Sequence, residues 1–203
     1  MTVKVYVEGG GDHNKALDSE CRRGFSEFFR KAGLERPRTP SVVACGGRQQ
    51  AYSAFLTAHA IAEPGSLKIL LVDSEAPVVE NDPWEHVRLR PGDGWLRPNG
   101  ATQDQLHFMV QAMEAWFYAD QDELQRYFRG RFHPGALSRR PDVEDIPKGD
   151  LLTGLERATR HSEKGEYSKG SHSFEILAQI DPARVRVSAK HADRLLSVLN
   201  QVC

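Results

Sequence analysis

Two carboxylates directly follow an apolar run of the chain. Residues 69–72 are consecutive apolar residues, and Asp73 and Glu75 come straight after them. Turn-forming Pro and Gly residues precede the run, so we expect residues 67–73 to form a strand buried on both faces. The two acids then leave its carboxyl end, where open α/β sheets bind their ligands. Either they turn together toward one cation, or the strand ends in a polar, solvated loop.

A third carboxylate ends the first predicted strand. Residues 3–8 alternate and are rich in β-branched side chains, so Glu8 closes a strand that starts near residue 1. A triple glycine follows, whose backbone can turn sharply and expose its amides. We therefore regard Gly10 and Gly11 as candidate phosphate contacts. The alternative is a plain strand-to-helix turn with Asp12 as the helix N-cap.

Two basic residues and one further acid are candidates for the same chemistry. Arg48 follows a glycine turn after a short strand at 41–45, where it either grips a phosphate or is a surface residue. Lys169 lies in a predicted polar loop and either neutralises a substrate phosphate or is only solvated. Glu114 lies in a helix predicted over 111–120, as an added ligand or orienting group or merely as a charge that complements the helix dipole.

Strands and helices alternate along the first 120 residues. Strands are expected at 3–8, 41–45, 67–73 and 106–110, and helices at about 12–33, 48–62 and 111–120. This order predicts an α/β fold with a mostly parallel four-stranded sheet, flanked by helices and joined by right-handed crossovers. All four strands then end at one edge of the sheet, which brings together the candidates Glu8, Arg48, Asp73, Glu75, Gln111 and Glu114.

The chain divides into an α/β core and a helical extension. The core spans 1–120 and includes an irregular excursion at 76–104, which is too apolar for a linker and is expected to cover the rim of the site. Residues 121–203 form helices packed on the core. These helices are expected at 121–129, 150–160, 171–179 and 188–201, with a turn starting at Pro182.

Composition narrows the classes of partner and compartment. The chain has 203 residues, 39% hydrophobic and 27% charged, with a net charge of −1, so it has no global basic footprint for nucleic acid. No segment is long enough for a bilayer span, and no signal peptide is apparent. Three widely spaced cysteines (Cys21, Cys45 and Cys203) argue against a zinc site or a disulfide framework and for the reducing cytoplasm.

A local basic segment at 126–140 is the best candidate for a nucleic-acid contact. It includes Arg129 and Arg131, and aromatic residues interleave with its arginines. That pattern suits a phosphate backbone with bases stacked on exposed rings. The alternative is a solvated basic face whose aromatic side chains turn into the core.

Four carboxylates at one sheet edge require a cation. They would repel one another strongly without one, and hard oxygen ligands without a Cys/His cluster favour Mg²⁺ or Mn²⁺. Such an ion polarises a phosphoryl oxygen and activates water; two ions, if both bind, are expected about 3.5–4 Å apart.

A glutamate closing the first strand, with a later hydrophobic strand ending in an acid-x-acid pair, resembles the Toprim domain of topoisomerases, primases and OLD-type nucleases. The resemblance implies that Glu8 is a general acid/base and that Asp73 and Glu75 hold Mg²⁺. The second acid of the pair is glutamate where Toprim domains usually have aspartate, which changes the geometry offered to a metal.

A longer resemblance is to the Toprim-like domain-of-unknown-function family 4276. It is carried by residues 7–12 (VEGGGD), 71–75 (LVDSE), 109–117 (MVQAMEAWF) and 167–170 (YSKG). Membership implies a Toprim-like fold, an ATPase partner encoded nearby and a role in phage defence, but no settled substrate.

These patterns lead to two expectations of function. The first is a Mg²⁺- or Mn²⁺-dependent phosphodiesterase, that is, a nuclease acting on nucleic acid, DNA rather than RNA. The second is a non-catalytic module that binds an ATPase partner or a nucleotide; homo-oligomerisation is left open. A Rossmann dinucleotide site lacks its GxGxxG spacing here, and the Walker A motif is absent.

Overall fold

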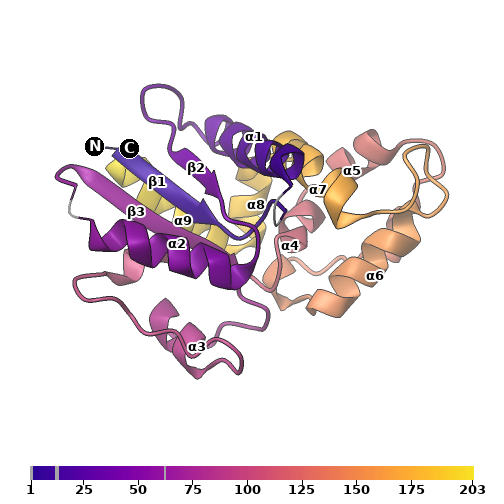
Figure 1. Ribbon diagram of the computed structural model, residues 1–203. Helices are drawn as coiled ribbons and strands as arrows, with labels where there is room; N and C mark the ends of the chain where they lie inside the picture. The colour runs from indigo at the N-terminus through magenta and orange to yellow at the C-terminus, as the bar shows by residue number, and fades with distance from the viewer. Residues whose placement is uncertain (1, 12–13, 62) are drawn as a thin grey trace.

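The computed structural model describes residues 2–11, 14–61 and 63–203, and its centre is a sheet of four parallel strands (Figure 1). The strands are β1 (Thr2–Val7), β2 (Ser41–Ala44), β3 (Ser66–Asp73) and β4 (Leu106–Met109), in the order β2-β1-β3-β4. All three pairings are parallel. The expected α/β fold with flanking helices is confirmed, and each strand lies within one residue of its predicted start and end.

The strand order creates a switch point between β1 and β3. The chain leaves β1 toward β2 on one side, then returns to form β3 on the other side of β1. Crossovers diverge there, so a crevice opens outside the carboxyl ends of these two strands, where α/β sheets bind ligands. Glu8 follows β1 directly and Asp73 ends β3, so both acids lie at this crevice.

One face of the sheet is covered by α1 (Lys15–Lys31) and the C-terminal helices. Side chains alternate between faces along β1 and β3, and Val5 and Ile69 point to this side with the buried phenylalanines of α1. Asn14 caps α1 by accepting a hydrogen bond from the Leu17 amide. The proposed N-cap, Asp12, lies outside the described residues.

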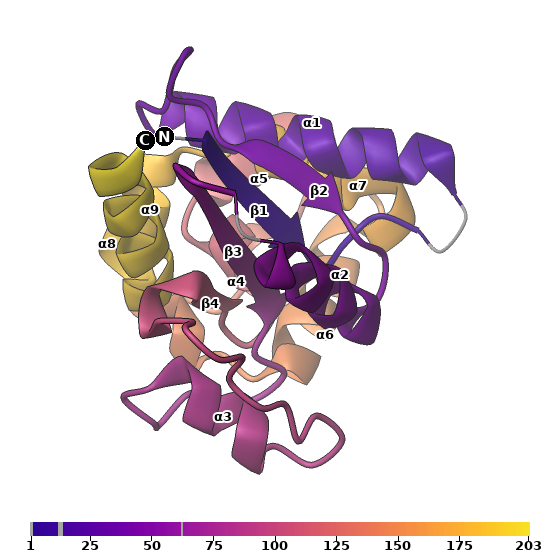
Figure 2. The same ribbon diagram turned by 60° about the vertical axis from the view of Figure 1, so that its left-hand side comes forward.

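Helix α7 (Lys169–Gln179) packs directly on α1, beside which it lies in both views (Figures 1 and 2). The contact is close at Gly24, where an added Cβ would lie 2.8 Å from the Phe174 carbonyl oxygen. The Lys31 ammonium of α1 also donates to the Ile180 carbonyl, 2.8 Å away. Because Lys169 is the first residue of α7, this packing fixes the position of its backbone.

The other face is covered by α2 (Arg48–Ala60) and by the 76–104 excursion. Trp84, Val87 and Trp95 are buried there against residues of β3 and α2. The excursion is ordered and packed on the sheet, as expected, but it is not wholly irregular. It contains α3 (Pro83–Leu89), because Asp82 caps the helix and proline suits its first position.

The remaining helices form the C-terminal part of the molecule, and α9 packs beside β4 (Figure 2). They are α4 (Glu114–Tyr118), α5 (Gln121–Phe128), α6 (Lys148–Thr159), α8 (Pro182–Ser188) and α9 (Lys190–Val202), with 3₁₀ turns at Gln103–Gln105, Pro134–Ala136 and Val143–Asp145. No helix of the described chain combines the length and apolarity needed to cross a membrane.

Three predicted boundaries in this part were wrong. The helix expected over 111–120 is only the five-residue α4, because residues 110–111 form a bend that is bonded to the turn after β3: the Glu75 amide donates to the Gln111 carbonyl, 2.9 Å away. Pro182 begins the helix α8 rather than a turn, since Asp181 caps it. Lys169 is the first residue of α7 and not part of a loop.

Candidate functional site

Glu8, Asp73 and Glu75 come together at the switch point. Each offers a carboxylate oxygen, and these three atoms lie within 4.8 Å of one another. They come from the end of β1, the last residue of β3 and the turn after it. Of the side chains expected to meet at this edge, these three acids therefore do meet; we call them the acidic triad.

The Glu8 carboxylate is held by two donors. Its Oε2 accepts from the Asp73 backbone N–H at 3.1 Å and from Arg48 Nη1 at 3.3 Å. Burial raises the pKa of Glu8, while the Arg48 charge and the Asp73 hydrogen bond oppose that rise. The Glu8 carboxyl group therefore has a fixed orientation and holds a proton more readily than an ordinary glutamate.

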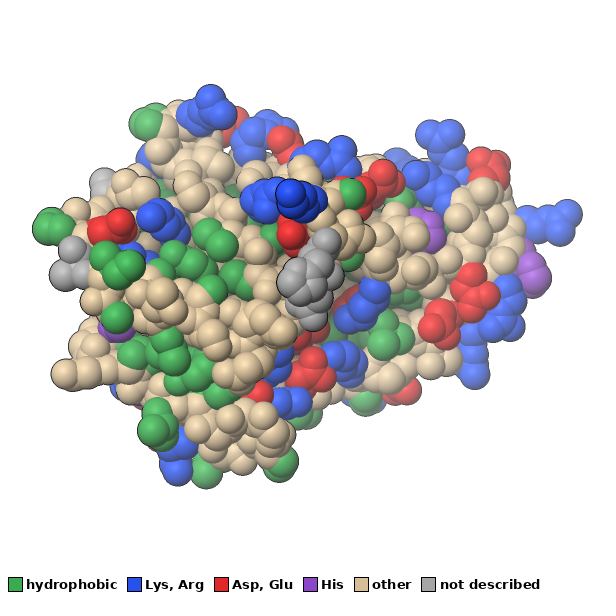
Figure 3. Space-filling model, in the orientation of Figure 1, with side chains coloured by type: hydrophobic (Ala, Val, Ile, Leu, Met, Phe, Trp, Pro, Cys, Tyr) green, Lys and Arg blue, Asp and Glu red, His purple; other side chains and the backbone are tan. Residues whose placement is uncertain are grey.

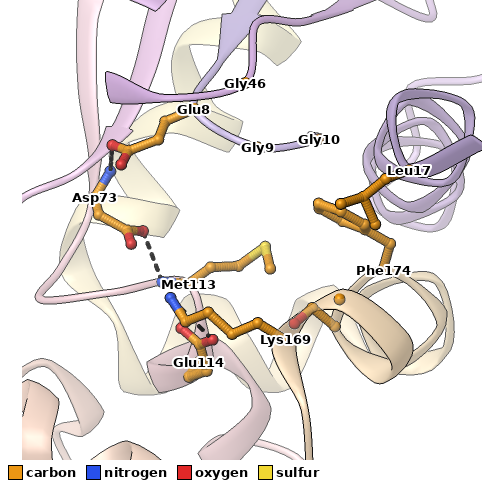
Figure 4. Close-up of a pocket in the computed structure, with 12 residues that line it drawn as sticks. Glu8, Gly9, Gly10, Leu17, Gly46, Asp73, Met113, Glu114, Lys169 and Phe174 are labelled. Atoms are coloured by element: carbon orange, nitrogen blue, oxygen red, sulfur yellow. Dashed lines mark hydrogen bonds and ion pairs between the residues drawn. The ribbon is translucent and has the colours of Figure 1, made fainter. Parts of the chain in front are cut away.

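Asp73 is the most deeply placed acid of the triad. It is 6% exposed, and its Oδ1 accepts from the Met113 backbone N–H at 2.9 Å (Figure 4). Burial, and then the charges of Glu8 and Glu114, raise the pKa of Asp73 to about 8. The carboxylate form is therefore costly at neutral pH unless a cation lies beside it.

Glu75 reaches the triad through an unusual backbone conformation. Its φ is 64°, in the left-handed region that non-glycine residues seldom adopt. The Ser74 and Glu75 amides bond to the Met109 and Gln111 carbonyls, which fixes the turn after β3. Strained residues held by their surroundings cluster at functional sites. The bend expected after Asp73 is present.

Lys148, at the start of α6, was not identified from the sequence. Its Nζ lies 2.5 Å from Glu75 Oε1 and 3.8 Å from Asp73 Oδ2. Gln111, expected at the sheet edge as a site residue, instead accepts from the Lys148 backbone N–H at 3.2 Å. A lysine 73 residues from its partner in a Pro-Lys-Gly sequence carries no local signal of this contact.

Arg48 is half-buried and engaged by protein groups. Its Nε and Nη2 form a bidentate pair with Asp93, at 2.9 and 2.6 Å, and its Nη1 donates to Glu8 and to the Asp73 carbonyl oxygen. Its guanidinium also stacks on Trp95, 4.7 Å from the ring centroid. The excursion thus supplies Asp93, a buried partner that the sequence did not reveal, and this geometry favours a positioning role for Arg48.

Glu114 and Lys169 form a second charged pair beside the triad. Lys169 Nζ lies 3.2 Å from Glu114 Oε1, which also accepts from the Tyr167 hydroxyl at 2.8 Å. Burial lowers the pKa of Lys169, but Glu114 and Asp73 outweigh it, so the pKa is raised and the ammonium stays charged. Glu114 is fully buried, and its Oε2 has no hydrogen-bond partner among the described residues.

A pocket of about 210 Å³ joins the two charged groups (Figure 4). Glu8, Asp73, Glu114 and Lys169 line it, with an apolar wall on the side of α1 and α7. On the surface, acidic and basic side chains interleave near the middle of the face seen in Figure 3. The pocket therefore offers fixed charges of both signs next to an apolar wall.

The glycine turn is only partly available to a ligand. Gly10 lines the pocket, but Gly11 does not, and its N–H already donates to Asp18 Oδ1 at 3.1 Å. A Cβ on Gly10 would lie 2.4 Å from Asp18 Oδ1, so the turn needs glycine to pack against α1.

The basic segment lies outside this pocket. Arg129 and Arg131 are exposed and are not among the pocket residues. Tyr127 and Phe128 are buried, and Phe132 packs against the same core, so the aromatic side chains turn inward. Of the two interpretations of this segment, the structure has the one in which the aromatic side chains face the core.

The donor set of the triad fits a hard divalent cation. All three ligands are carboxylates, which Mg²⁺ and Mn²⁺ prefer, and no histidine or cysteine belongs to this group of described residues. The buried, unpaired Oε2 of Glu114 beside the pocket adds an acceptor that a cation or a hydroxyl group would satisfy. The residues present are therefore consistent with the expected metal.

Comparison with known proteins gives one match. No curated protein and no solved structure matches the chain. One protein family does, over residues 7–200, which includes every residue of the triad and the pocket. The chain therefore belongs to the family described as a domain of unknown function, DUF4276.

Proposed function

We propose that this protein is a Mg²⁺- or Mn²⁺-dependent phosphodiesterase that acts on nucleic acid. The observation that carries the proposal is the acidic triad, three carboxylate oxygens within 4.8 Å at the carboxyl ends of two adjacent parallel strands. Glu8, Asp73 and Glu75 would hold the ion. When bound, the ion supplies a Lewis acid for a phosphoryl oxygen and lowers the pKa of a coordinated water.

The protein groups around the triad have distinct roles in this proposal. Glu8 moves a proton at its carboxylate, and Arg48 keeps that carboxylate oriented. Lys169 contacts a non-bridging phosphate oxygen, and Glu114 with Tyr167 positions the lysine. The resemblance to Toprim domains supports the same roles for Glu8, Asp73 and Glu75.

The wider setting follows from family resemblance and composition. We propose DNA rather than RNA as the substrate, an ATPase as the partner, the cytoplasm as the compartment and phage defence as the context. The exposed Arg129 and Arg131 are the proposed contacts to the nucleic-acid backbone outside the pocket.

A second candidate is a non-catalytic module that binds an ATPase partner or a nucleotide. The Lys148 ammonium supports it, because it lies 2.5 Å from Glu75 and balances part of the triad's charge with no ion. Under this reading the acids and lysines form a structural network, and the pocket only binds.

Cleavage assays separate the two candidates. The purified protein, alone and with its ATPase partner, is incubated with Mn²⁺ and either plasmid or single-stranded DNA. Glu8→Gln and Asp73→Asn should each lower the cleavage rate by at least about a hundredfold, because each loses a charge that acts on the reacting groups. Glu35→Gln and Asp145→Asn change exposed carboxylates and should leave the rate unchanged.

Activity that survives in both site variants would refute the assignment of these residues. Absence of cleavage by the wild type with its partner would favour the binding module. A melting-temperature rise with Mn²⁺ that is lost in Asp73→Asn would then show that the metal site exists without catalysis.

A further inference from the structure

Lys148 occupies the edge of the triad that a metal ion would need. Its Nζ is 2.5 Å from Glu75 Oε1 and 3.8 Å from Asp73 Oδ2, so one ammonium contacts two of the three candidate ligands. Lys169, the other lysine at the site, contacts Glu114, which is outside the triad. Of the two, Lys148 is therefore the direct competitor for the ligand oxygens.

The main chain holds Lys148 in place while its side chain keeps some freedom. Its backbone N–H donates to Gln111 Oε1 at 3.2 Å, and the Gln111 amide donates in turn to the Glu144 carbonyl at 3.3 Å. The Lys148 side chain is 27% exposed. Because the Lys148 side chain is flexible and partly exposed, its ammonium can turn toward solvent without a movement of α6.

The charges around the triad are nearly balanced without an ion. Of the described residues, the cluster contains five carboxylates (Glu8, Asp73, Glu75, Asp93 and Glu114) and four cationic groups (Arg48, Arg90, Lys148 and Lys169). With every group ionised, including Asp73 as it would be when it holds an ion, the protein groups alone carry one net negative charge. Removal of the Lys148 charge would leave two, the amount that one divalent cation neutralises.

We propose that Lys148 is an internal counter-ion that competes with the divalent cation for Glu75 and Asp73 and thereby weakens metal binding. This inference rests on the proposed metal site. The ammonium keeps the acids compensated before the ion arrives, and it must leave Glu75 when the ion binds. Metal loading is then set by the ion concentration in the cell rather than being permanent.

The competition makes a prediction opposite to that of a structural or ligand-holding role. A lysine that merely supports the site would, once removed, weaken the ion's binding. A competitor, once removed, strengthens it. Lys148→Met and Lys148→Gln should therefore bind Mn²⁺ at least about tenfold more tightly than the wild type, while Lys148→Arg keeps the charge and the weaker affinity.

Calorimetric titration of the full chain with Mn²⁺ at one fixed pH measures this directly, without any substrate or cleavage. Lys190→Met is the matched control, because Lys190 is also the first residue of a helix but is exposed and lies outside the pocket. Its affinity should equal that of the wild type. Far-ultraviolet circular dichroism checks that each variant is folded.

The outcomes separate this inference from the proposed function. Equal or weaker Mn²⁺ binding by folded Lys148→Met and Lys148→Gln overturns the role of Lys148 and leaves the metal site standing. Failure of the wild type and of both neutral variants to bind Mn²⁺ overturns the metal site, and the inference with it. Tighter binding in both neutral variants but not in Lys148→Arg or Lys190→Met supports the competition.

Discussion

Asp73 lowers the stability of the folded protein at neutral and higher pH, because its carboxyl group is buried beside other acids. It is buried beside Glu8 and Glu114, and its pKa is raised to about 8 in the folded protein, against 3.8 for an ordinary aspartate. Between these two values the folded state holds a proton that the unfolded state has lost. The contribution of Asp73 to the free energy of unfolding therefore falls as the pH rises from about 4 to about 8.

Asp73→Asn should accordingly stabilise the metal-free protein, and more so at higher pH. The amide keeps an acceptor for the Met113 N–H but carries no buried charge. The variant and the wild type should have the same melting temperature near the ordinary aspartate pKa. Near pH 8 the variant should melt at a higher temperature, and its free energy of unfolding should be greater by on the order of a few kcal/mol. Thermal melting with a chelator present, at several pH values, measures this.

The same melts with Mn²⁺ provide the second half of the test. The ion should stabilise the wild type and not Asp73→Asn, which reverses their order. Asp145→Asn, at an exposed position, should follow the wild type under all conditions. A variant that is less stable than the wild type at high pH without metal would contradict the account of Asp73.

The acids of the site could be predicted from the sequence, but their counter-ions could not. Glu8, Asp73 and Glu75 end parallel strands, and parallel strands end at one edge. Lys148 and Asp93 reach the site from a helix start and from the excursion, elements whose position depends on tertiary packing. The glycine turn before Arg48 predicted a contact with phosphate. The bidentate pair with Asp93 instead favours a role in which Arg48 positions the Glu8 carboxylate.

Among the elements, α7 decides where Lys169 lies. This helix packs on α1 at Gly24, and its residue Phe174 lines the pocket, so the distance between the two helices sets the width of the pocket. A side chain at position 24 would push the helices apart. The pocket therefore depends on a glycine that does not itself line it.

Gly24→Ala should destabilise the protein by about 1–3 kcal/mol. It should also lower the affinity for any ligand that contacts Lys169. The added Cβ would lie 2.8 Å from a backbone oxygen, and that overlap outweighs the gain of about 1 kcal/mol in helix propensity. Gly149→Ala, in α6, meets open space and should be neutral or slightly stabilising. Urea unfolding of both variants decides the point; equal effects would show that the helices do not touch at Gly24 as described.

Element type was predicted well where the hydrophobic period was long and less well where capping decided the outcome. The apolar run of β3 and the stripe of α1 specify a buried strand and a helix. The short helices α3 and α8 each depend on an aspartate cap followed by proline, within segments expected to be irregular. The residues before α4 stay out of the helix because they bond to the turn after β3.

At the scale of the whole molecule, a net charge of −1 leaves no general attraction to nucleic acid. In the proposed nuclease, affinity for DNA would then come from local groups: the metal, Lys169 and the exposed arginines of the 126–140 segment. Its aromatic side chains are buried, so this segment can contact phosphates but cannot stack on bases.

The double variant Arg129→Ala/Arg131→Ala should lower DNA affinity to the same extent for different sequences. Each arginine neutralises one phosphate, and a single strand contributes about 0.7 per phosphate, so the slope of log K against log salt should become shallower by about 1.4. Fluorescence anisotropy with labelled single-stranded DNA of two sequences, in Ca²⁺ to limit cleavage, measures the slope. Arg157→Ala serves as an exposed control from α6; an unchanged slope in the double variant would remove these arginines from the interface.

The central claim is that the acids ending β1 and β3 form one cation site. Anomalous diffraction from crystals soaked in Mn²⁺ tests it most directly. The account predicts a peak at about 2.1 Å from oxygens of Glu8, Asp73 and Glu75, the distance that small hard cations require, and no such peak in Asp73→Asn. Well-diffracting soaked crystals with no peak at the triad, or with Mn²⁺ bound only elsewhere, would contradict it.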